Sequence, residues 1–340
     1  MMDAMGAMDA VGPMSDDARA ILLLCTSVAA GRGDDARPLG PAGWAKVAAQ
    51  VARAGLAPGS LLGLDEAALA QLLGDAVPSA EAAVRQLART GQLAIELDRL
   101  AMRGISAVTL ADDAYPWRLR DRLGPKAPPV LFTAGERSLL NAGGVAIVGS
   151  RDIDAAGESF AADVASSAAR AGRAVVSGGA RGVDQTAMRA ALAAGGTVLG
   201  LLPEGIERRI REPETREALT DGLALLASPY NPGAGFTAGA AMGRNKLIYA
   251  LADVAVIVAS AARTGGTWSG AEEALKAAWV PVFVRQADDA PEGNRLLLRM
   301  GAHPLNAPEA PDPATVTPSR QAAEPAAPFV QATLGLDDNA

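Results

Sequence analysis

The sequence predicts an α/β protein: a Rossmann-like, doubly wound and mainly parallel sheet preceded by a small all-helical domain. In the second half of the chain, short apolar runs alternate with helical stretches, which is the pattern of βαβ units. These runs are apolar throughout, as expected for strands that are covered on both faces of a sheet. The first hundred residues instead carry helical periodicity and little strand signal.

Six strands and five helices are expected in the second half. The strands are predicted at Val145–Val148, Ala174–Val176, Thr197–Leu202, Leu223–Ala227, Val254–Ala259 and Val280–Val284. The helices are predicted at Ala155–Ala171, Val183–Ala194, Thr215–Asp221, Gly239–Leu251 and Gly270–Ala278. Strands and helices that alternate in this way define one Rossmann-like domain over residues 145–303.

The N-terminal part divides into a leader and a helical domain. Residues 1–14 are rich in Met, Ala and Gly and are expected to be a disordered leader. Residues 15–104 are expected to form the helical domain, with one long helix over Ser79–Met102. Within it, the pattern Leu61–Leu69 is typical either of a helix–hairpin–helix DNA-binding module or of a simple packing module.

Two further segments flank the predicted Rossmann-like domain. Residues 105–144 are rich in proline and are interpreted as a connecting strap, in which Val130–Phe132 is a possible edge strand. Residues 304–340 are rich in Pro, Ala, Glu, Ser and Thr and are expected to be a disordered tail, because they offer too little apolar surface to pack.

Composition excludes several classes of site. The net charge of −7 over 340 residues argues against a basic whole-surface nucleic-acid binder, so any contact with DNA needs a local basic pocket. The single cysteine, Cys25, cannot form an internal disulfide, which fits a reducing cytoplasm. With a single histidine, His303, the chain cannot form a His/Cys zinc cluster, and we expect no metal and no cofactor. Because no apolar run approaches about 20 residues, we expect no membrane span and a cytoplasmic protein.

The turns that follow the predicted strands carry the chemistry. Ligands bind at the carboxyl ends of strands in a parallel sheet, and glycine-rich loops that lead into helices can present backbone N–H groups to an anion. Arginine adds a planar fork that matches phosphate oxygens. The candidate DNA- or phosphate-binding residues are Gly149, Ser150, Arg151, Ser177, Gly178, Gly179, Arg181, Gly182, Arg244, Asn245, Lys246, Gly265, Gly266 and Thr267.

Each of these features also has a purely structural explanation. Asp184 could cap a helix, and Ser269 with Glu272 has the spacing of a capping box. Arg244 and Lys246 could be solvated surface charges. The recurrence of such turns at the ends of three strands favours a phosphate site. The sequence shows no pair of nucleophile and base, so no catalytic residue is assigned.

The order of these turns resembles the DprA (Smf) family of DNA-processing proteins. The resemblance covers Leu110 to Ala302 and rests on Val145–Arg151, Ser177–Asp184, Arg244-Asn245-Lys246 and Gly265-Gly266-Thr267, with Tyr115–Leu119 and Pro128–Phe132 ahead of them. It implies a Rossmann-like domain that binds single-stranded DNA through backbone phosphates, forms a homodimer, and protects incoming DNA and delivers it to the recombinase RecA in natural transformation. It also implies that Arg151, Arg181, Gly182, Arg244 and Asn245 occupy positions of the family's motifs.

Several positions depart from the family's pattern. Met188 stands where the family often has histidine, and Lys246 stands where it usually has arginine. The family's Ser-Gly-Ser turn is represented by Thr264–Thr267, and we expect no counterpart of its frequent C-terminal winged-helix domain in this sequence. The chain therefore resembles a divergent branch.

Two other functions fit the same pocket. Phosphoribohydrolases of the LOG type carry Gly-Gly-x-Gly-Thr-x-x-Glu, and here Gly265, Gly266 and Glu272 fall on matching positions. Trp268 stands where the motif needs its next glycine, and we expect its side chain to fill space that the ribose phosphate requires. The third function is a nucleotide-sensing regulator, for example in phage defence.

Overall fold

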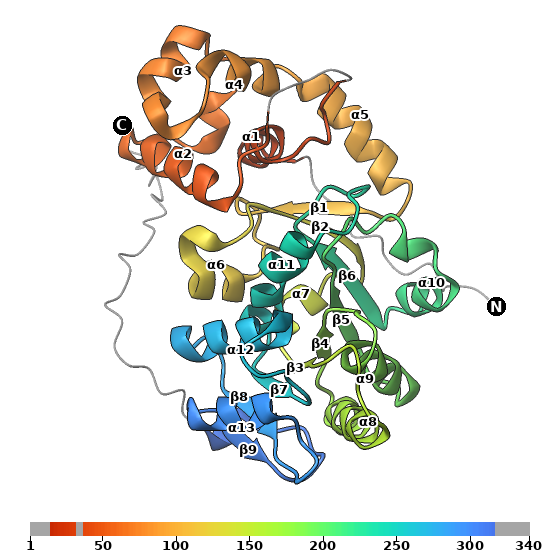
Figure 1. Cartoon of the computed structure of the whole chain (residues 1–340). Helices are drawn as coiled ribbons and strands as arrows, with labels where there is room; N and C mark the ends of the chain where they lie inside the picture. The colour runs from red at the N-terminus through yellow and green to blue at the C-terminus, as the bar shows by residue number, and fades with distance from the viewer. Residues whose placement is uncertain (1–13, 32–36, 317–340) are drawn as a thin grey trace, which may run out of the picture.

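The computed structural model describes residues 14–31 and 37–316. Within these ranges it contains a nine-stranded sheet with the order β1-β2-β6-β5-β4-β3-β7-β8-β9. Helices cover both faces of this sheet, and a cluster of helices from the N-terminal part lies at one end of it (Figure 1). The predicted α/β fold with a mainly parallel sheet is therefore confirmed. Most of the predicted leader lies outside the described residues.

The parallel part of the sheet contains all six predicted strands. They are β3 (Val145–Val148), β4 (Val175–Ser177), β5 (Val198–Leu201), β6 (Ala224–Ser228), β7 (Val254–Ile257) and β8 (Val282–Arg285). The chain builds outward from β3 through β4, β5 and β6, and then crosses to the other side of β3 with β7 and β8. This reversal beside β3 is the topological switch point at which such sheets bind ligands.

Alternate residues of β3 are buried in two different hydrophobic cores, one on each face of the sheet. This explains why the strand is apolar throughout. Val145 and Ile147 pack with α8 (Ala155–Arg170), α9 (Val183–Ala193) and α10 (Pro213–Thr220). Ala146 and Val148 face the opposite core. That core is covered by α6 (Trp117–Leu123), α7 (Leu139–Ala142), α11 (Ala238–Leu251), α12 (Gly265–Ala277) and α13 (Glu292–Arg299).

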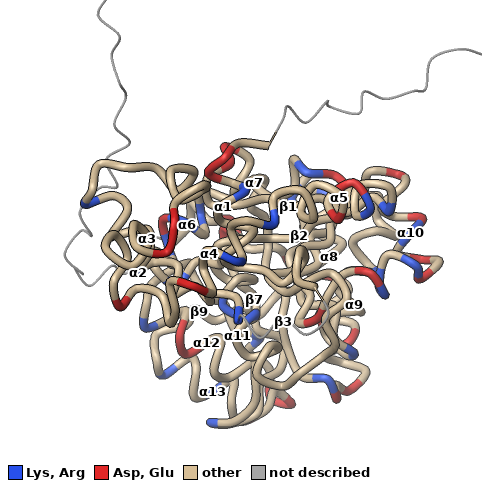
Figure 2. Tube along the Cα trace, turned by 90° about the horizontal axis from the view of Figure 1, so that it is seen from above, with Lys and Arg blue, Asp and Glu red and all other residues tan. Residues whose placement is uncertain are grey.

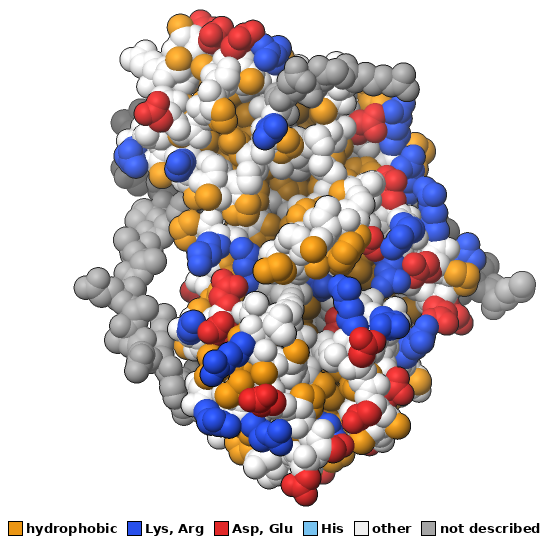
Figure 3. Space-filling view, in the orientation of Figure 1, with side chains coloured by type: hydrophobic (Ala, Val, Ile, Leu, Met, Phe, Trp, Pro, Cys, Tyr) orange, Lys and Arg blue, Asp and Glu red, His pale blue; other side chains and the backbone are white. Residues whose placement is uncertain are grey.

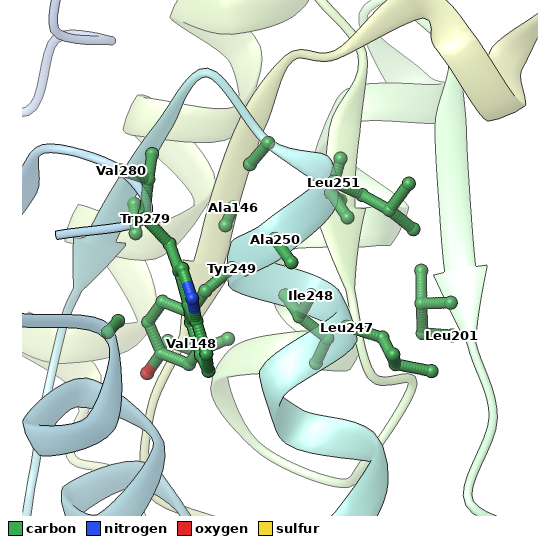
Figure 4. Packing of buried hydrophobic residues seen from close by; sticks show 14 of the residues in the cluster. Ala146, Val148, Leu201, Leu247, Ile248, Tyr249, Ala250, Leu251, Trp279 and Val280 are labelled. Atoms are coloured by element: carbon green, nitrogen blue, oxygen red, sulfur yellow. The ribbon is translucent and has the colours of Figure 1, made fainter. Parts of the chain in front are cut away.

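Figure 4 shows the second core from close by. The apolar turns of α11, from Leu247 to Leu251, lie over Ala146 and Val148 of the sheet, and Trp279 closes the cluster. This packing fixes the last two turns of α11 against the sheet. It therefore also fixes the direction of the preceding turn of α11, which carries Arg244.

The segment 105–144 differs from the expected connector because it supplies two strands of the sheet. β1 (Ser106–Thr109) pairs with β2 (Val130–Gly135), and β2 pairs with β6, both in antiparallel register. Val130–Phe132 is therefore covered by β1 and is not an edge strand. Val130, Leu131 and Phe132 are all buried, since helices cover both faces of β2 as well.

The helical N-terminal part consists of α1 (Asp16–Cys25), α2 (Pro41–Arg53), α3 (Glu66–Leu73), α4 (Ala80–Leu87) and α5 (Thr90–Ala101). The single long helix expected over Ser79–Met102 is broken at Ala88 and Arg89, because α4 packs on α3 whereas α5 packs on β1. These helices share one core with Phe132 and Leu226 of the sheet. Their packing onto β2 and β6 covers the end of the sheet that is shown beneath them in Figure 1.

The start of the expected disordered tail is ordered in the structure. β9 (His303–Leu305) pairs with β8 in parallel register. The backbone N–H of Ala310 donates to Ser167 Oγ on α8 at 3.2 Å, and Arg173 donates to the carbonyl of Pro311. Hydrogen bonds to α8 and to the turn after it hold this segment, and its residues Leu305, Ala310 and Val316 pack against the neighbouring core. Residues 317–340 lie outside the described residues.

No helix in the described ranges is both long enough and apolar enough to cross a bilayer.

Candidate phosphate-binding site

A cavity of about 410 Å³ lies at the carboxyl ends of β3, β4 and β5, beside the switch point. Figure 3 shows Lys and Arg side chains gathered next to α11 on this face of the molecule. Four arginines are among the described residues that line the cavity, although basic and acidic residues are interspersed over the molecule as a whole (Figure 2). The lining residues are Arg151, Gly178, Gly179, Ala180, Arg181, Leu202, Pro203, Glu204, Arg209, Phe236 and Arg244.

The turn after β3 places Arg151 in the cavity. Gly149 is required there, since a Cβ at this position would lie 2.4 Å from Val183 Cγ2 at the start of α9. The Ser150 hydroxyl accepts from the N–H of Asp152 at 3.2 Å, so Gly149 and Ser150 shape the turn and do not line the cavity. The guanidinium carbon of Arg151 lies 5.8 Å from the centre of the Phe236 ring.

The glycine-rich loop after β4 is shaped by close contacts. Ser177 is fully buried and donates its hydroxyl hydrogen to the carbonyl of Ile147 at 2.7 Å, so its role is structural. A Cβ at Gly178 would lie 2.0 Å from Arg244 Nη1. Gly182 has a φ of +84° and leaves only 2.4 Å between a Cβ and the carbonyl oxygen of Ser150. Arg181, between them, is exposed and forms an ion pair with Asp152.

The N–H groups of these loops point toward a buried carboxylate. Asp184 on α9 is 6% exposed and accepts from the N–H of Ala180 at 3.4 Å. Burial raises the pKa of Asp184 to about 6, while Arg244 and hydrogen bonds from the N–H groups of Ala180, Gly178 and Gly149 oppose this increase. Asp184 is therefore an internal anion of the site, in place of the helix cap that the sequence suggested, and it uses donors that we expected to face a ligand.

Arg244 lines the cavity and interacts electrostatically with the buried Asp184. Its side chain is nearly completely buried, and its Nη1 donates to the carbonyl of Leu201 at the end of β5. Burial lowers the pKa of Arg244, and Asp184 opposes this change. The alternative interpretation of Arg244 as a solvated surface charge is therefore wrong. A ligand in the cavity meets guanidinium groups, since the N–H groups of Gly149, Gly178 and Ala180 already have Asp184 as an acceptor.

The remaining predicted residues lie outside the cavity lining. Asn245 donates from Nδ2 to the carbonyl of Gly266 at 3.0 Å, which ties α11 to the start of α12. Other predicted residues that do not line the cavity are Lys246, Gly265, Gly266 and Thr267. The turn after β7 therefore does not line the cavity, and its contact with the site is the hydrogen bond between Gly266 and Asn245, the residue next to Arg244.

Two interpretations of α12 need correction. Ser269 and Glu272 do not form a capping box, because the N-cap is Thr264 and Glu272 pairs with Lys276 at 2.9 Å. Trp268 is buried in the hydrophobic core and does not line the cavity, so its side chain does not fill the ligand space as we expected. The residues that resemble the phosphoribohydrolase motif, Gly265, Gly266 and Glu272, are absent from the cavity lining among the described residues.

Three functional candidates were missed in the sequence. Arg209 donates from Nη2 to the carbonyl of Gly179 at 2.6 Å and pairs with Glu212 at 2.8 Å. Glu204 lies three residues beyond β5. The charged run after that strand was a usable signal for both residues, because it follows a parallel strand at its carboxyl end. No comparable sequence signal marks Phe236, because it lies far from the end of a strand, in the long connection between β6 and α11.

The comparison with known families decides the assignment. The model for DNA recombination-mediator protein A matches residues 106–311. The chain belongs to the DNA recombination-mediator protein A family. The matched region begins at β1 and includes the segment that packs on α8, so the family unit is larger than residues 145–303.

Curated relatives of this family match a large part of the chain. The sequence is 34% identical over 225 residues to a putative DNA processing protein DprA of Mycobacterium tuberculosis, which covers 61% of this chain and 57% of that protein. It is 32% identical over 171 residues to the DNA processing protein DprA of Streptococcus pneumoniae, covering 49% of this chain and 58% of that protein. The chain thus spans little more than half the length of these relatives.

Two solved structures of the family share the fold. DprA from Streptococcus pneumoniae superposes with a TM-score of 0.62 at 23% identity, covering 79% of this chain and 90% of that chain. A structure of DNA processing protein A from Helicobacter pylori, described for its single-stranded DNA binding mode, gives a TM-score of 0.50 at 28% identity and covers 60% of this chain and 92% of that one.

The raised pKa of Asp184 predicts a pH-dependent contribution to stability. Because the folded-state pKa of about 6 lies above the usual value of 3.8, this contribution is complete below about pH 4 and is lost as the pH rises through 6. Relative to Asp184→Asn, the wild type is expected to lose on the order of 1–3 kcal/mol of unfolding free energy between pH 4 and 7. Urea denaturation of both proteins across this range measures the difference.

The control is Asp163→Asn, at an exposed position on the neighbouring helix α8. Its stability profile is expected to run parallel to that of the wild type from pH 4 to 7. Parallel profiles for Asp184→Asn and the wild type would show that folding does not shift the pKa of Asp184.

Proposed function

We propose that this chain binds single-stranded DNA through its backbone phosphates, with the phosphates held by the arginines of the cavity. The observation that carries the proposal is the convergence of Arg151, Arg181, Arg209 and Arg244, from four different segments, on one cavity at the switch point. Guanidinium groups pair with phosphate oxygens through two parallel hydrogen bonds. The single-stranded DNA binding described for the Helicobacter pylori relative supports the same ligand.

The shape of the site favours a single strand over a duplex. Arg244 is only 4% exposed, so a phosphate reaches it only by entering the cavity. A single strand can bend locally to bring one phosphate inward, whereas duplex DNA stays stiff over a persistence length of about 150 base pairs. The overall charge of −7 repels DNA elsewhere on the molecule, so binding depends on this local cluster.

Titration of a fluorescent 30-residue dT strand and of a duplex of equal length tests the proposal. We expect the single strand to bind more tightly and its affinity to fall steeply as salt rises, because phosphate contacts release counterions. Strands of other simple sequence are expected to bind similarly, since phosphate contacts carry no sequence information. Equal or tighter binding of the duplex, or no binding of the single strand at low salt, would contradict the proposal.

We also propose that the bound strand is protected and then passed to the recombinase RecA during transformation or recombination, and that the protein acts as a homodimer in the cytoplasm. The description of the family as a recombination mediator supports the transfer. RecA filament formation on a strand already bound by this protein is expected to be faster than on a strand coated with an unrelated single-strand binder.

Sedimentation at several protein concentrations measures the oligomeric state and so tests the proposed homodimer.

A further inference from the structure

Part of the cavity lining has no role in holding a phosphate. It consists of the apolar residues Leu202, Pro203 and Phe236 together with the acidic residue Glu204. A phosphate needs no apolar wall and is repelled by a carboxylate. The volume of about 410 Å³ is that of sites for small organic molecules, which span about 300–1,000 Å³. The cavity therefore has room and suitable chemistry for more than the phosphate.

Glu204 is held firmly in this part of the lining. Its backbone carbonyl accepts from the hydroxyl of Ser228, at the end of β6, at 2.7 Å. Its two carboxylate oxygens accept from a single nitrogen, Arg208 Nη2, at 2.9 and 3.2 Å. A carboxylate offers about four acceptor positions, so both oxygens keep the capacity to accept from a ligand. The side chain is 11% exposed, and Glu204 lines the cavity.

We propose that the cavity binds a complete nucleotide and that Glu204 selects guanine. The Watson–Crick edge of guanine presents two adjacent donors, N1–H and the N2 amino group, which match the two carboxylate oxygens. Thymine instead presents one N–H between two carbonyl oxygens, which the carboxylate repels. Phe236 is half exposed and offers the base an aromatic face, next to the Arg151 guanidinium. The inference rests on the proposed function, because the phosphate of the same nucleotide pairs with the guanidinium groups of the cavity.

The test has two arms, because the nucleotide could belong to a strand or be free. In the first arm, dGMP, dIMP and dTMP are titrated calorimetrically into the full chain; dIMP lacks only the N2 amino group of dGMP. We expect dGMP to bind about tenfold or more tightly than dTMP, with dIMP between them. In the second arm, a 20-residue dT strand with one central dG is compared with the all-dT strand, and the dG strand is expected to bind several-fold more tightly.

Glu204→Gln is the decisive variant, because its amide presents one donor and one acceptor in the same volume. It is expected to bind the all-dT strand at least as well as the wild type and to lose the preference for guanine. Glu207→Gln is the matched control, since Glu207 pairs with Arg103 on the same loop and does not line the cavity. This control is expected to keep the preference.

The outcomes separate the inference from the proposed function. A preference for dGMP without a preference for the dG strand supports guanine recognition and identifies the ligand as a free nucleotide. Equal binding of guanine and thymine in both arms, or a preference that survives in Glu204→Gln, overturns the inference. If the all-dT strand binds in a salt-dependent way while guanine gives no preference, the inference fails and the proposed function stands. Failure of every strand to bind at low salt removes the proposed function itself.

Discussion

Arg244→Ala is expected to lower the unfolding free energy by about 3–5 kcal/mol and to abolish measurable binding of single-stranded DNA. The loss of stability follows from Asp184, which would remain buried without its favourable electrostatic interaction with Arg244. The hydrogen bond to the carbonyl of Leu201 is also lost. The loss of binding follows from removing the deepest cation of the cavity. Urea denaturation and strand titration measure the two effects.

A double variant separates folding from binding. Arg244→Met combined with Asp184→Asn removes both buried charges, so neither is left uncompensated. Compared with Arg244→Met, the double variant is expected to recover stability without recovering DNA binding. The difference between the double variant and the two single variants gives the coupling of the pair. A single Arg244 variant that remains as stable as the wild type and binds DNA normally would show that this arginine is not part of the site.

Arg151→Ala is expected to weaken binding of single-stranded DNA by about 1–3 kcal/mol, the size of a lost hydrogen bond to a charged group. Its side chain is exposed on the turn after β3, so the unfolding free energy is expected to change by less than about 0.5 kcal/mol. Because one phosphate contact is lost, the dependence of the logarithm of affinity on the logarithm of salt should become shallower by about one unit. Strand titrations at several salt concentrations measure both effects.

Arg170→Ala is the matched control for Arg151→Ala. Arg170 is exposed at the end of α8 and does not line the cavity, and its loss removes the same charge from the molecule. We expect its affinity and salt dependence to follow the wild type. Normal DNA binding by Arg151→Ala, or unfolding of that variant, would show that the site is placed incorrectly.

The sequence by itself was sufficient for the class of fold and for the position of the site along the chain. The strands from β3 to β8 are short apolar runs followed by turns, and this local alternation does not depend on distant contacts. Parallel strands present their carboxyl ends at one edge of the sheet, so the turns after β3 and β4 could be assigned to one site. Arg151 and Arg181, which these two turns carry, both line the cavity in the structure.

Only the tertiary structure decided which side chains of the site face a ligand. Arg244 and Lys246 are two residues apart on one helix, yet only Arg244 lines the cavity, because the packing of α11 on the sheet fixes its rotation. The N–H groups of Gly178 and Ala180 in the glycine-rich loop donate to the carboxylate of Asp184. This contact forms only when α9, which carries Asp184, packs against that loop. β1 and β2 join the sheet through antiparallel pairs far apart in sequence. The physical reason is the same in each case: side-chain direction and strand pairing depend on contacts between distant segments, which no local pattern of residues encodes.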